Sequence, residues 1–217
     1  MVLFDLDGTL VDTAYDLGRA LNLLLKKYDK PTLPHEEIRP VASHGTAALL
    51  TLGFGLLPDV QEFELLKAEY LTLYAEALKE KPVLLPEIEQ LLDALEAKNM
   101  AWGVVTNKPR RFSLPLLQVA MTKTGSLYAR ATCLVCADDV PQAKPAPDSL
   151  LLACRQTGTD PRICVYVGDA ERDIVAGRAA GMKTVVALFG YLSEADAPDT
   201  WGADFQIERP LELLQFI

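Results

Sequence analysis

Two aspartates near the start of the chain are placed where they could do chemistry. Asp5 and Asp7 lie two positions apart, directly after the apolar residues Val2–Phe4, and a Gly-Thr pair follows them. Apolar residues that lead into a glycine turn predict a short buried strand. Ligands of open α/β sheets bind beyond the carboxyl ends of the strands, so we expect both carboxylates to face a ligand there.

Such a pair of carboxylates implies a cation. One Asp can act as a nucleophile, while its neighbour holds a divalent metal or donates a proton to a leaving group. Two ionised acids this close repel each other, so they need a bound cation or one protonated member. Mg²⁺, which prefers oxygen ligands, would supply the charge and attract a phosphate. Gly8 is expected to allow a tight turn and to leave its N–H open to an anion, although Asp-Gly pairs are also ordinary turns.

Two later strand ends carry residues suited to phosphate or metal binding. Thr106 and Asn107 follow an apolar run, and their hydroxyl and amide can donate to phosphate oxygens without adding negative charge. The strand predicted at Ile163–Val167 leads to Asp169 and, four residues on, Asp173. Two acids that straddle a strand end and a helix start can face one metal.

These residues resemble the motifs of the haloacid dehalogenase superfamily of phosphohydrolases. The segment Phe4–Thr13, Phe-Asp-Leu-Asp-Gly-Thr-Leu-Val-Asp-Thr, is similar to the first motif. The resemblance implies that Asp5 is a nucleophile that becomes an aspartyl-phosphate and that Asp7 is the general acid/base. The true dehalogenases are less similar, because they lack an acid at the position of Asp7. A halide leaves without a proton, whereas an alkoxide needs one.

The resemblance also implies roles in phosphate binding. Thr106 matches the second motif, a Ser or Thr that binds the transferring phosphoryl group. Lys144, which opens a proline-rich turn, matches the third motif, a lysine that neutralises the nucleophile and the phosphate. An isolated lysine is usually a solvated surface residue, but an anion that attacks an anion requires cations between them. Gly8, Thr9 and Asn107 are expected to contact the substrate.

The fourth motif implies the metal site. Asp169 matches a metal ligand, and Asp173 matches either a ligand through water or the partner that holds Lys144. With Asp5 and the carbonyl of Asp7, these residues would bind Mg²⁺.

The surrounding elements predict a core with an insertion. Helical spacing of apolar residues occurs in three stretches before the second strand, Tyr15–Tyr28, Thr46–Leu52 and Gln61–Glu80. This block is too long for one crossover. We therefore expect an α/β fold in which residues 1–13 and 82–217 form a Rossmann-like core with a parallel sheet, and residues 14–81 form an inserted α-helical cap. Asp12–Ala14 and Lys81–Pro86 would be the hinges.

The cap offers candidate substrate contacts. Ser43, His44 and Thr46 precede a predicted helix and could present hydroxyls, an imidazole and a helix N-terminus to an anion. Alternatively, Ser43 or Thr46 caps the helix and His44 is solvated. Arg39 could contact a substrate carboxylate or hydroxyl, or form a surface ion pair.

Composition limits the possible partners. The formal net charge of −9 and the lack of a basic stripe argue against nucleic acid. No apolar run reaches the roughly 18 residues of a membrane helix, and no charged region precedes an apolar one at the N-terminus. We expect a soluble, cytoplasmic monomer or homodimer that acts on a small phosphorylated metabolite.

The four cysteines are expected to be core thiols. Cys133 and Cys136 form a C-x-x-C, which could indicate a redox or zinc site. However, they lie in the apolar run Ala131–Cys136, where a strand would point residues three apart to opposite faces. Cys154 and Cys164 also lie in apolar runs, as in proteins of a reducing compartment.

Within the superfamily the chain resembles the phosphoglycolate phosphatase group. A narrower likeness is to the N-acetylmuramic acid 6-phosphate phosphatases of bacterial cell-wall recycling, and it rests on Trp102–Pro109, Gly190-Tyr191 and Trp201–Asp204. The expected function is Mg²⁺-dependent hydrolysis of a small phosphate monoester. A phosphomutase of the β-phosphoglucomutase type would share every core residue but exclude water. A non-catalytic metal- or partner-binding role would require a missing core residue, and none is missing.

Overall fold

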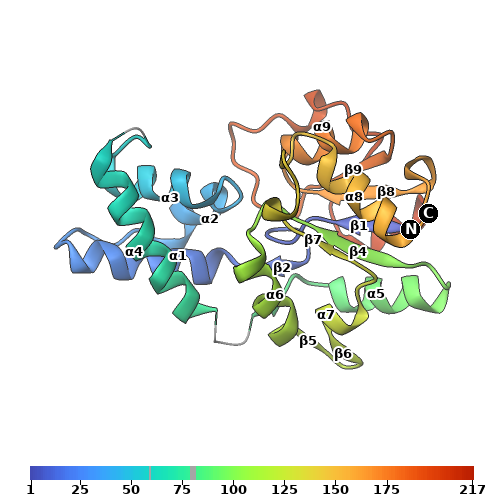
Figure 1. Ribbon diagram of the computed structural model, residues 1–217, viewed down its shortest axis with the longest axis horizontal. Coiled ribbons are helices and arrows are strands. Elements are labelled where there is room, and N and C mark those ends of the chain that lie inside the picture. Colours follow the sequence, from blue (N-terminus) through green and yellow to red (C-terminus); the bar gives the residue numbers. More distant parts are fainter. Residues whose placement is uncertain (59, 79–81) are drawn as a thin grey trace.

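The computed structural model describes residues 1–58, 60–78 and 82–217. Within them, a parallel sheet of six strands forms the centre of the core. Its strands, in order across the sheet, are β10 (Phe205–Ile207), β9 (Lys183–Ala187), β8 (Val165–Gly168), β1 (Val2–Phe4), β4 (Trp102–Val105) and β7 (Leu134–Val135). The predicted α/β core with a parallel sheet is confirmed, and β1 lies between β8 and β4 (Figure 1).

Helices cover both faces of this sheet. The core helices are α5 (Ile88–Ala97), α6 (Arg110–Val119), α7 (Leu127–Arg130), α8 (Asp148–Thr157) and α9 (Glu171–Ala179), with short 3₁₀ helices η1 (Ala137–Asp139), η2 (Pro161–Ile163), η3 (Pro198–Thr200) and η4 (Pro210–Gln215). Successive residues of a strand point to opposite faces. Leu3 accordingly packs with buried residues of α8 and α9, whereas Phe4 packs with those of α5 and α6. This two-sided burial explains why the strands read as continuous apolar runs.

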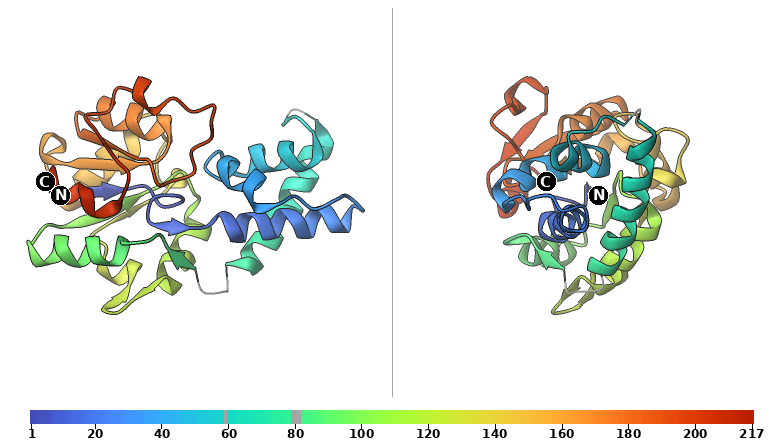
Figure 2. Two further views of the ribbon diagram at one scale, coloured as in Figure 1. Left: turned by 180° about the vertical axis from the view of Figure 1, so that it is seen from behind. Right: turned by 90° about the vertical axis from the view of Figure 1, so that its left-hand side faces the viewer.

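Four helices lie beyond the carboxyl edge of the sheet, between β2 and β3. They are α1 (Ala14–Lys27), α2 (His35–Ala42), α3 (Gly45–Phe54) and α4 (Gln61–Ala77). Figure 1 and Figure 2 show them at one end of the molecule, with both termini at the other. The Tyr70 hydroxyl of α4 donates to the Leu17 carbonyl of α1 at 3.1 Å. Among the described residues, no helix is long and apolar enough to cross a membrane.

The two connections to these helices meet in a small ribbon. β2 (Val11–Asp12) pairs antiparallel with β3 (Val83–Leu84). The ribbon therefore joins the helical insert to the core at a single place. The exact domain boundaries stay a prediction, because residues 79–81 lie outside the described part of the chain. The predicted return hinge at Lys81–Pro86 falls partly in that gap.

Several elements differ from the sequence-based expectations. α2 was not among the predicted helices, and Pro40 lies inside it. The helix instead begins after Pro34 and tolerates the loss of one backbone hydrogen bond. α6 likewise runs through Pro115 without a break. Neither β10 nor the short hairpin of β5 (Met121–Thr122) and β6 (Gly125–Ser126) was among the predicted strands.

The cysteines lie where the strand pattern places them. Cys133 packs in the apolar cluster on the α8 and α9 face, and Cys136 packs in the cluster on the opposite face. Burial raises the pKa of both thiols to about 11. All four cysteines are free and buried. The C-x-x-C is therefore part of the core and is not a joint redox or metal site.

Candidate active site

Asp5 lies at the carboxyl end of β1 in a buried ion-pair network. The Lys144 Nζ donates to Asp5 Oδ1 at 2.8 Å, to Asp173 Oδ1 at 2.7 Å and to the Tyr166 hydroxyl at 2.6 Å. It also donates to the Val105 carbonyl at 3.1 Å. Burial lowers the pKa of Lys144, but the Asp173 and Asp5 carboxylates outweigh it and raise that pKa above its ordinary value. Lys144 is therefore a fixed positive charge beside Asp5.

The turn that carries Lys144 is held by Asn107. The Asn107 amide donates to the Lys144 carbonyl at 2.8 Å and its oxygen accepts the Lys144 N–H at 3.0 Å. Both polar atoms of the amide thus bind backbone, although Asn107 also lines the cavity described below. These contacts position Lys144, and the expected contact between Asn107 and the substrate stays a prediction.

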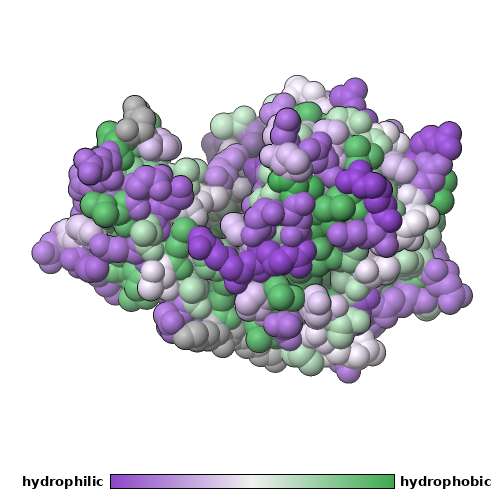
Figure 3. Space-filling model, in the orientation of Figure 1, coloured by the Kyte–Doolittle hydropathy of each residue, from purple (hydrophilic) through white to green (hydrophobic). Residues whose placement is uncertain are grey.

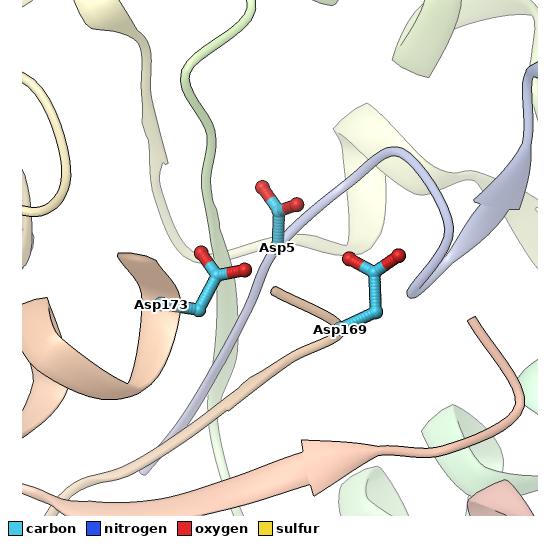
Figure 4. Close-up of side chains that lie close together, drawn as sticks. All are labelled: Asp5, Asp169 and Asp173. Atoms are coloured by element: carbon cyan, nitrogen blue, oxygen red, sulfur yellow. The ribbon is translucent and has the colours of Figure 1, made fainter. Parts of the chain in front are cut away.

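Three buried carboxylates converge at this point (Figure 4). Ligand atoms of Asp5, Asp169 and Asp173 all lie within 4.8 Å of one another. The Asp169 Oδ2 accepts the Tyr191 N–H and the Ser43 hydroxyl, each at 2.9 Å. Burial, together with the Asp5 and Asp173 carboxylates, raises the pKa of Asp169 to about 7. The cluster therefore carries more negative charge than its hydrogen bonds stabilise.

The donor set fits a divalent cation. The Asp169 Oδ1 is buried and has no hydrogen-bond partner among the described residues, and such an atom is costly unless something pairs with it. The Asp173 oxygens are both engaged, because Oδ1 binds Lys144 and Oδ2 accepts the Ala170 N–H at 3.1 Å. A cation held by Asp169 and Asp5 would satisfy the unpaired oxygen and offset the repulsion. Carboxylate oxygens are the ligands that Mg²⁺ and Ca²⁺ prefer.

Asp7 has its own cation. Its Oδ1 accepts the Lys108 Nζ at 2.7 Å and the Thr13 hydroxyl at 2.5 Å. The Lys108 Nζ also lies 4.9 Å from the centre of the Tyr74 ring, which comes from α4. Sequence reasoning did not assign a role to Lys108. The only available signal was its place two residues after Thr106, at the end of a predicted strand.

The turn after Asp7 departs from one expectation. Gly8 adopts a φ of +80°, and a Cβ there would lie 2.3 Å from Asp169 Oδ2, so glycine is required. Its N–H was expected to be open to an anion, but it donates to the Val11 carbonyl at 3.1 Å because the turn closes on itself. Thr9 is fully buried, and its hydroxyl has no partner among the described residues. Neither residue lines the cavity.

Arg39 also differs from expectation. Its guanidinium donates to the Gly190 carbonyl at 2.9 Å and to the Phe189 carbonyl at 3.3 Å. It lies over the Tyr191 ring, 4.9 Å from the centre. Within the described residues, Arg39 therefore neither lines this cavity nor forms an ion pair. It joins α2 to the loop after β9, because backbone carbonyls of that loop face the cap.

Ser43 makes a second contact between cap and core. Its hydroxyl binds Asp169, as given above, and its carbonyl accepts the Arg172 guanidinium at 2.6 Å. Arg172, to which the sequence analysis assigned no role, lines the cavity beside the three carboxylates. His44 and Thr46 line the cavity as well, and no side chain caps α3.

A cavity of about 400 Å³ opens over Asp5 and Asp7 between the core and the cap helices, a size typical of small-molecule sites. Thr106, at the end of β4, lines it and accepts the Lys108 N–H on its hydroxyl at 3.1 Å. The apolar part of the wall includes Leu17, Leu71, Tyr74 and Phe112, and its cationic part comprises Lys67, Lys108, Arg111 and Arg172. In Figure 3 a notch separates the cap from the core at the upper edge. The site is thus an anion-binding cleft with a sheltered apolar wall.

This combination places a candidate carboxylate nucleophile at the end of β1 in a parallel α/β fold, as in hydrolases that act through an aspartate. The sequence matches the family model described as "Haloacid dehalogenase-like hydrolase" over residues 2–187. The chain belongs to the haloacid dehalogenase-like hydrolase family.

Proteins that carry phosphatase names are similar to the chain over nearly its whole length. It is 42% identical over 219 residues to the N-acetylmuramic acid 6-phosphate phosphatase of Pseudomonas aeruginosa, covering 100% of this chain and 93% of that protein. It is 40% identical over 212 residues to a phosphoglycolate phosphatase of Xanthomonas campestris, covering 98% and 93%. A solved structure of a predicted phosphoglycolate phosphatase from Haemophilus somnus superposes with a TM-score of 0.83 at 25% identity, covering 100% of this chain and 96% of that one.

Proposed function

We propose that the protein is a Mg²⁺-dependent phosphatase that hydrolyses a small phosphate monoester through an aspartyl-phosphate at Asp5. The observation that carries this proposal is the buried ion pair between Lys144 and Asp5. It lies beside the Asp169 Oδ1, which has no hydrogen-bond partner among the described residues. The relatives named above, which are phosphatases, support the same reaction class.

The chain's own residues can perform both half-reactions. The Asp5 carboxylate attacks phosphorus, and the bond from phosphorus to the leaving oxygen breaks as that oxygen takes a proton from Asp7. Asp7, now a carboxylate, then removes a proton from water. The water oxygen attacks the aspartyl-phosphate and releases inorganic phosphate and Asp5. The Thr106 hydroxyl donates to a phosphoryl oxygen in both steps, and Lys144, whose N–H groups are bound to protein acceptors, supplies a fixed positive charge beside it.

The metal site has a defined place in this scheme. Asp5, Asp169 and the Asp7 carbonyl would hold Mg²⁺, while Asp173 holds Lys144. The bound ion would neutralise negative charge on the phosphoryl group. Asp173 is assigned to Lys144 because both its oxygens already accept hydrogen bonds from the protein.

The cavity favours a sugar-sized substrate over a two-carbon one. Its wall of apolar and cationic side chains extends well beyond Asp5 to Lys67 and Arg111. A phosphoglycolate would occupy only the floor of a space of about 400 Å³. An acidic amino-sugar phosphate would fill it and place a carboxylate near those cations. N-acetylmuramic acid 6-phosphate is therefore the favoured candidate, with phosphoglycolate as the alternative.

The test is Mg²⁺-dependent phosphate release from a panel of phosphoglycolate, N-acetylmuramic acid 6-phosphate, hexose phosphates and pyrophosphate. We expect one compound to dominate, and Asp5→Asn to lower its turnover by at least about 10³-fold, because the nucleophile is lost. An isomerised sugar phosphate without free phosphate would indicate a phosphomutase. No turnover of any compound by the intact protein would contradict the proposal.

A further inference from the structure

Lys108 forms a buried ion pair whose partner is the proposed acid/base. The Lys108 and Asp7 side chains are only 7% and 16% exposed, and Nζ lies 2.7 Å from Oδ1. The Thr13 hydroxyl donates to that same oxygen. No protein hydrogen bond to Asp7 Oδ2 is found within the described residues. Two donors thus fix one carboxylate oxygen and leave the other available to exchange a proton.

The backbone of Lys108 is fixed on both sides. Its N–H donates to the Thr106 hydroxyl at 3.1 Å, and its carbonyl accepts the Ser113 hydroxyl at 3.1 Å. Its Cα is therefore held beside the residue proposed to bind the phosphoryl group. A long side chain that starts from a fixed point and ends in one ion pair has little freedom to leave Asp7.

The cap supplies the remaining contact. The Tyr74 ring of α4 lies 4.9 Å from the Lys108 Nζ, at a distance where a cation and an aromatic face attract each other. Tyr74 is 2% exposed, lines the cavity, and packs against Phe112 with ring centres 5.4 Å apart. The Tyr74 ring is packed against the core through Phe112. A shift of α4 would therefore move this ring relative to the Lys108 ammonium.

We propose that Lys108 is a positioning residue for proton transfer by Asp7, and that α4 completes the arrangement through Tyr74. This inference rests on the proposed phosphatase function. With Oδ1 held by the ammonium, Oδ2 is the oxygen of this cavity-lining residue that delivers a proton to the leaving oxygen as the bond to phosphorus breaks. The carboxylate that remains on Asp7 is then paired with Lys108, which stabilises it until water returns a proton.

Leaving-group dependence distinguishes this role from a structural one. A p-nitrophenolate leaves without a proton, whereas an alkoxide requires one. The ratio kcat/KM reports only the steps up to departure of the leaving group, so the later attack of water does not enter. For Lys108→Met we expect kcat/KM to fall about 100-fold for the fastest alkyl phosphate of the panel and less than about 5-fold for p-nitrophenyl phosphate, since general acid catalysis contributes about 10²–10⁴-fold.

Further variants make the comparison specific. Lys108→Arg keeps a cationic donor and should recover part of the lost alkyl phosphate activity. In an Asp7→Asn background, Lys108→Met should cause no additional loss with the alkyl phosphate, because both changes remove the same step. Tyr74→Leu should give the same selective loss at smaller magnitude.

The outcomes separate the two proposals. Wild-type turnover of both substrates tests the phosphatase function independently of Lys108. Parallel losses of kcat/KM for both substrates in Lys108→Met, or no loss for either, would overturn the positioning role while the phosphatase assignment stands. Additive losses in the double variant would also overturn it, because Lys108 would then act without Asp7.

Discussion

Asp169 shows how a single residue links backbone geometry to the metal site. Its two oxygens differ in their contacts. Oδ2 accepts hydrogen bonds from the Tyr191 N–H and the Ser43 hydroxyl, whereas Oδ1 has no hydrogen-bond partner among the described residues. The close approach of Gly8 leaves no space for a Cβ beside this carboxylate. The turn after β1 and the acid after β8 therefore depend on each other, although they lie far apart in the sequence.

A pair of glycine variants tests this dependence. Gly8 and Gly181 have similar backbone angles, with φ of +80° and +76°, but nothing lies within 4 Å of the Cβ position at Gly181. Gly181→Ala should cost only about 1–2 kcal/mol of unfolding free energy, from the left-handed backbone alone. Gly8→Ala should cost more, because its Cβ also displaces Asp169, and it should abolish the increase in unfolding free energy that we expect Mg²⁺ to cause in the wild type.

Urea unfolding with and without Mg²⁺ provides the measurement. Gly181→Ala is the control for backbone strain and should keep the full Mg²⁺ effect. Equal losses in the two variants, with the Mg²⁺ effect intact in both, would show that the contact between Gly8 and Asp169 has no influence on the metal site.

The strands determined which parts of the site could be predicted. Asp5, Thr106 and Asp169 follow apolar runs, and the carboxyl ends of parallel strands meet at one edge of a sheet, so their convergence followed from the pattern. Lys108 and Arg172 were missed because their roles depend on where the cap lies against the core. No periodicity within either segment encodes that placement. The prediction of a free N–H at Gly8 was wrong for a local reason, because this N–H donates a hydrogen bond to the Val11 carbonyl within the same turn.

Strand alternation also predicts how the thiols react. Cys133 and Cys136 point to opposite faces of the sheet, and their pKa values are raised to about 11 by burial. At pH 8 only about one thiol in 10³ is then a thiolate, which is the reactive form. We expect a thiol reagent such as DTNB to label the native protein negligibly within minutes and to label all four cysteines in urea.

The raised pKa values of Cys133 and Cys136 also determine whether the unfolding free energy rises or falls with pH. The folded-state pKa lies above the unfolded value near 8.5, so the folded state holds these protons more tightly. The resulting stabilisation is complete below about pH 8.5 and is lost as the pH rises toward 11. Rapid labelling of the native protein at pH 8 would contradict this account. So would an unfolding free energy that rises between pH 8.5 and 10.5 and no longer rises when Cys133 and Cys136 are replaced.

At the scale of the whole molecule, side-chain contacts hold the helical insert against the core, and a two-stranded ribbon connects the two parts. Arg39 binds the carbonyls of Phe189 and Gly190, and Ser43 reaches Asp169. The antiparallel pair of β2 and β3 connects the two parts. Because the cavity has walls from both, we expect a substrate to enter and a product to leave by movement about this ribbon.

A variant of Arg39 should loosen the cap without touching the reacting groups. Arg39→Gln removes the guanidinium contacts to the Phe189 and Gly190 carbonyls, which join α2 to the core. We expect faster amide hydrogen exchange across residues 189–191 and 38–45, and a KM that rises several-fold with kcat unchanged or higher, because the closed arrangement becomes less populated.

Lys27→Gln is the matched control. Lys27 pairs with Glu69 at 2.7 Å between α1 and α4, and this contact lies entirely inside the cap. An exposed pair of this kind contributes little to stability, so exchange at residues 189–191 should stay at the wild-type rate. If Arg39→Gln left that exchange unchanged too, and if the β2–β3 ribbon kept one geometry in phosphate-free and phosphate-bound crystals, the cap would be a fixed wall. Substrate would then have to reach Asp5 without any movement about the ribbon.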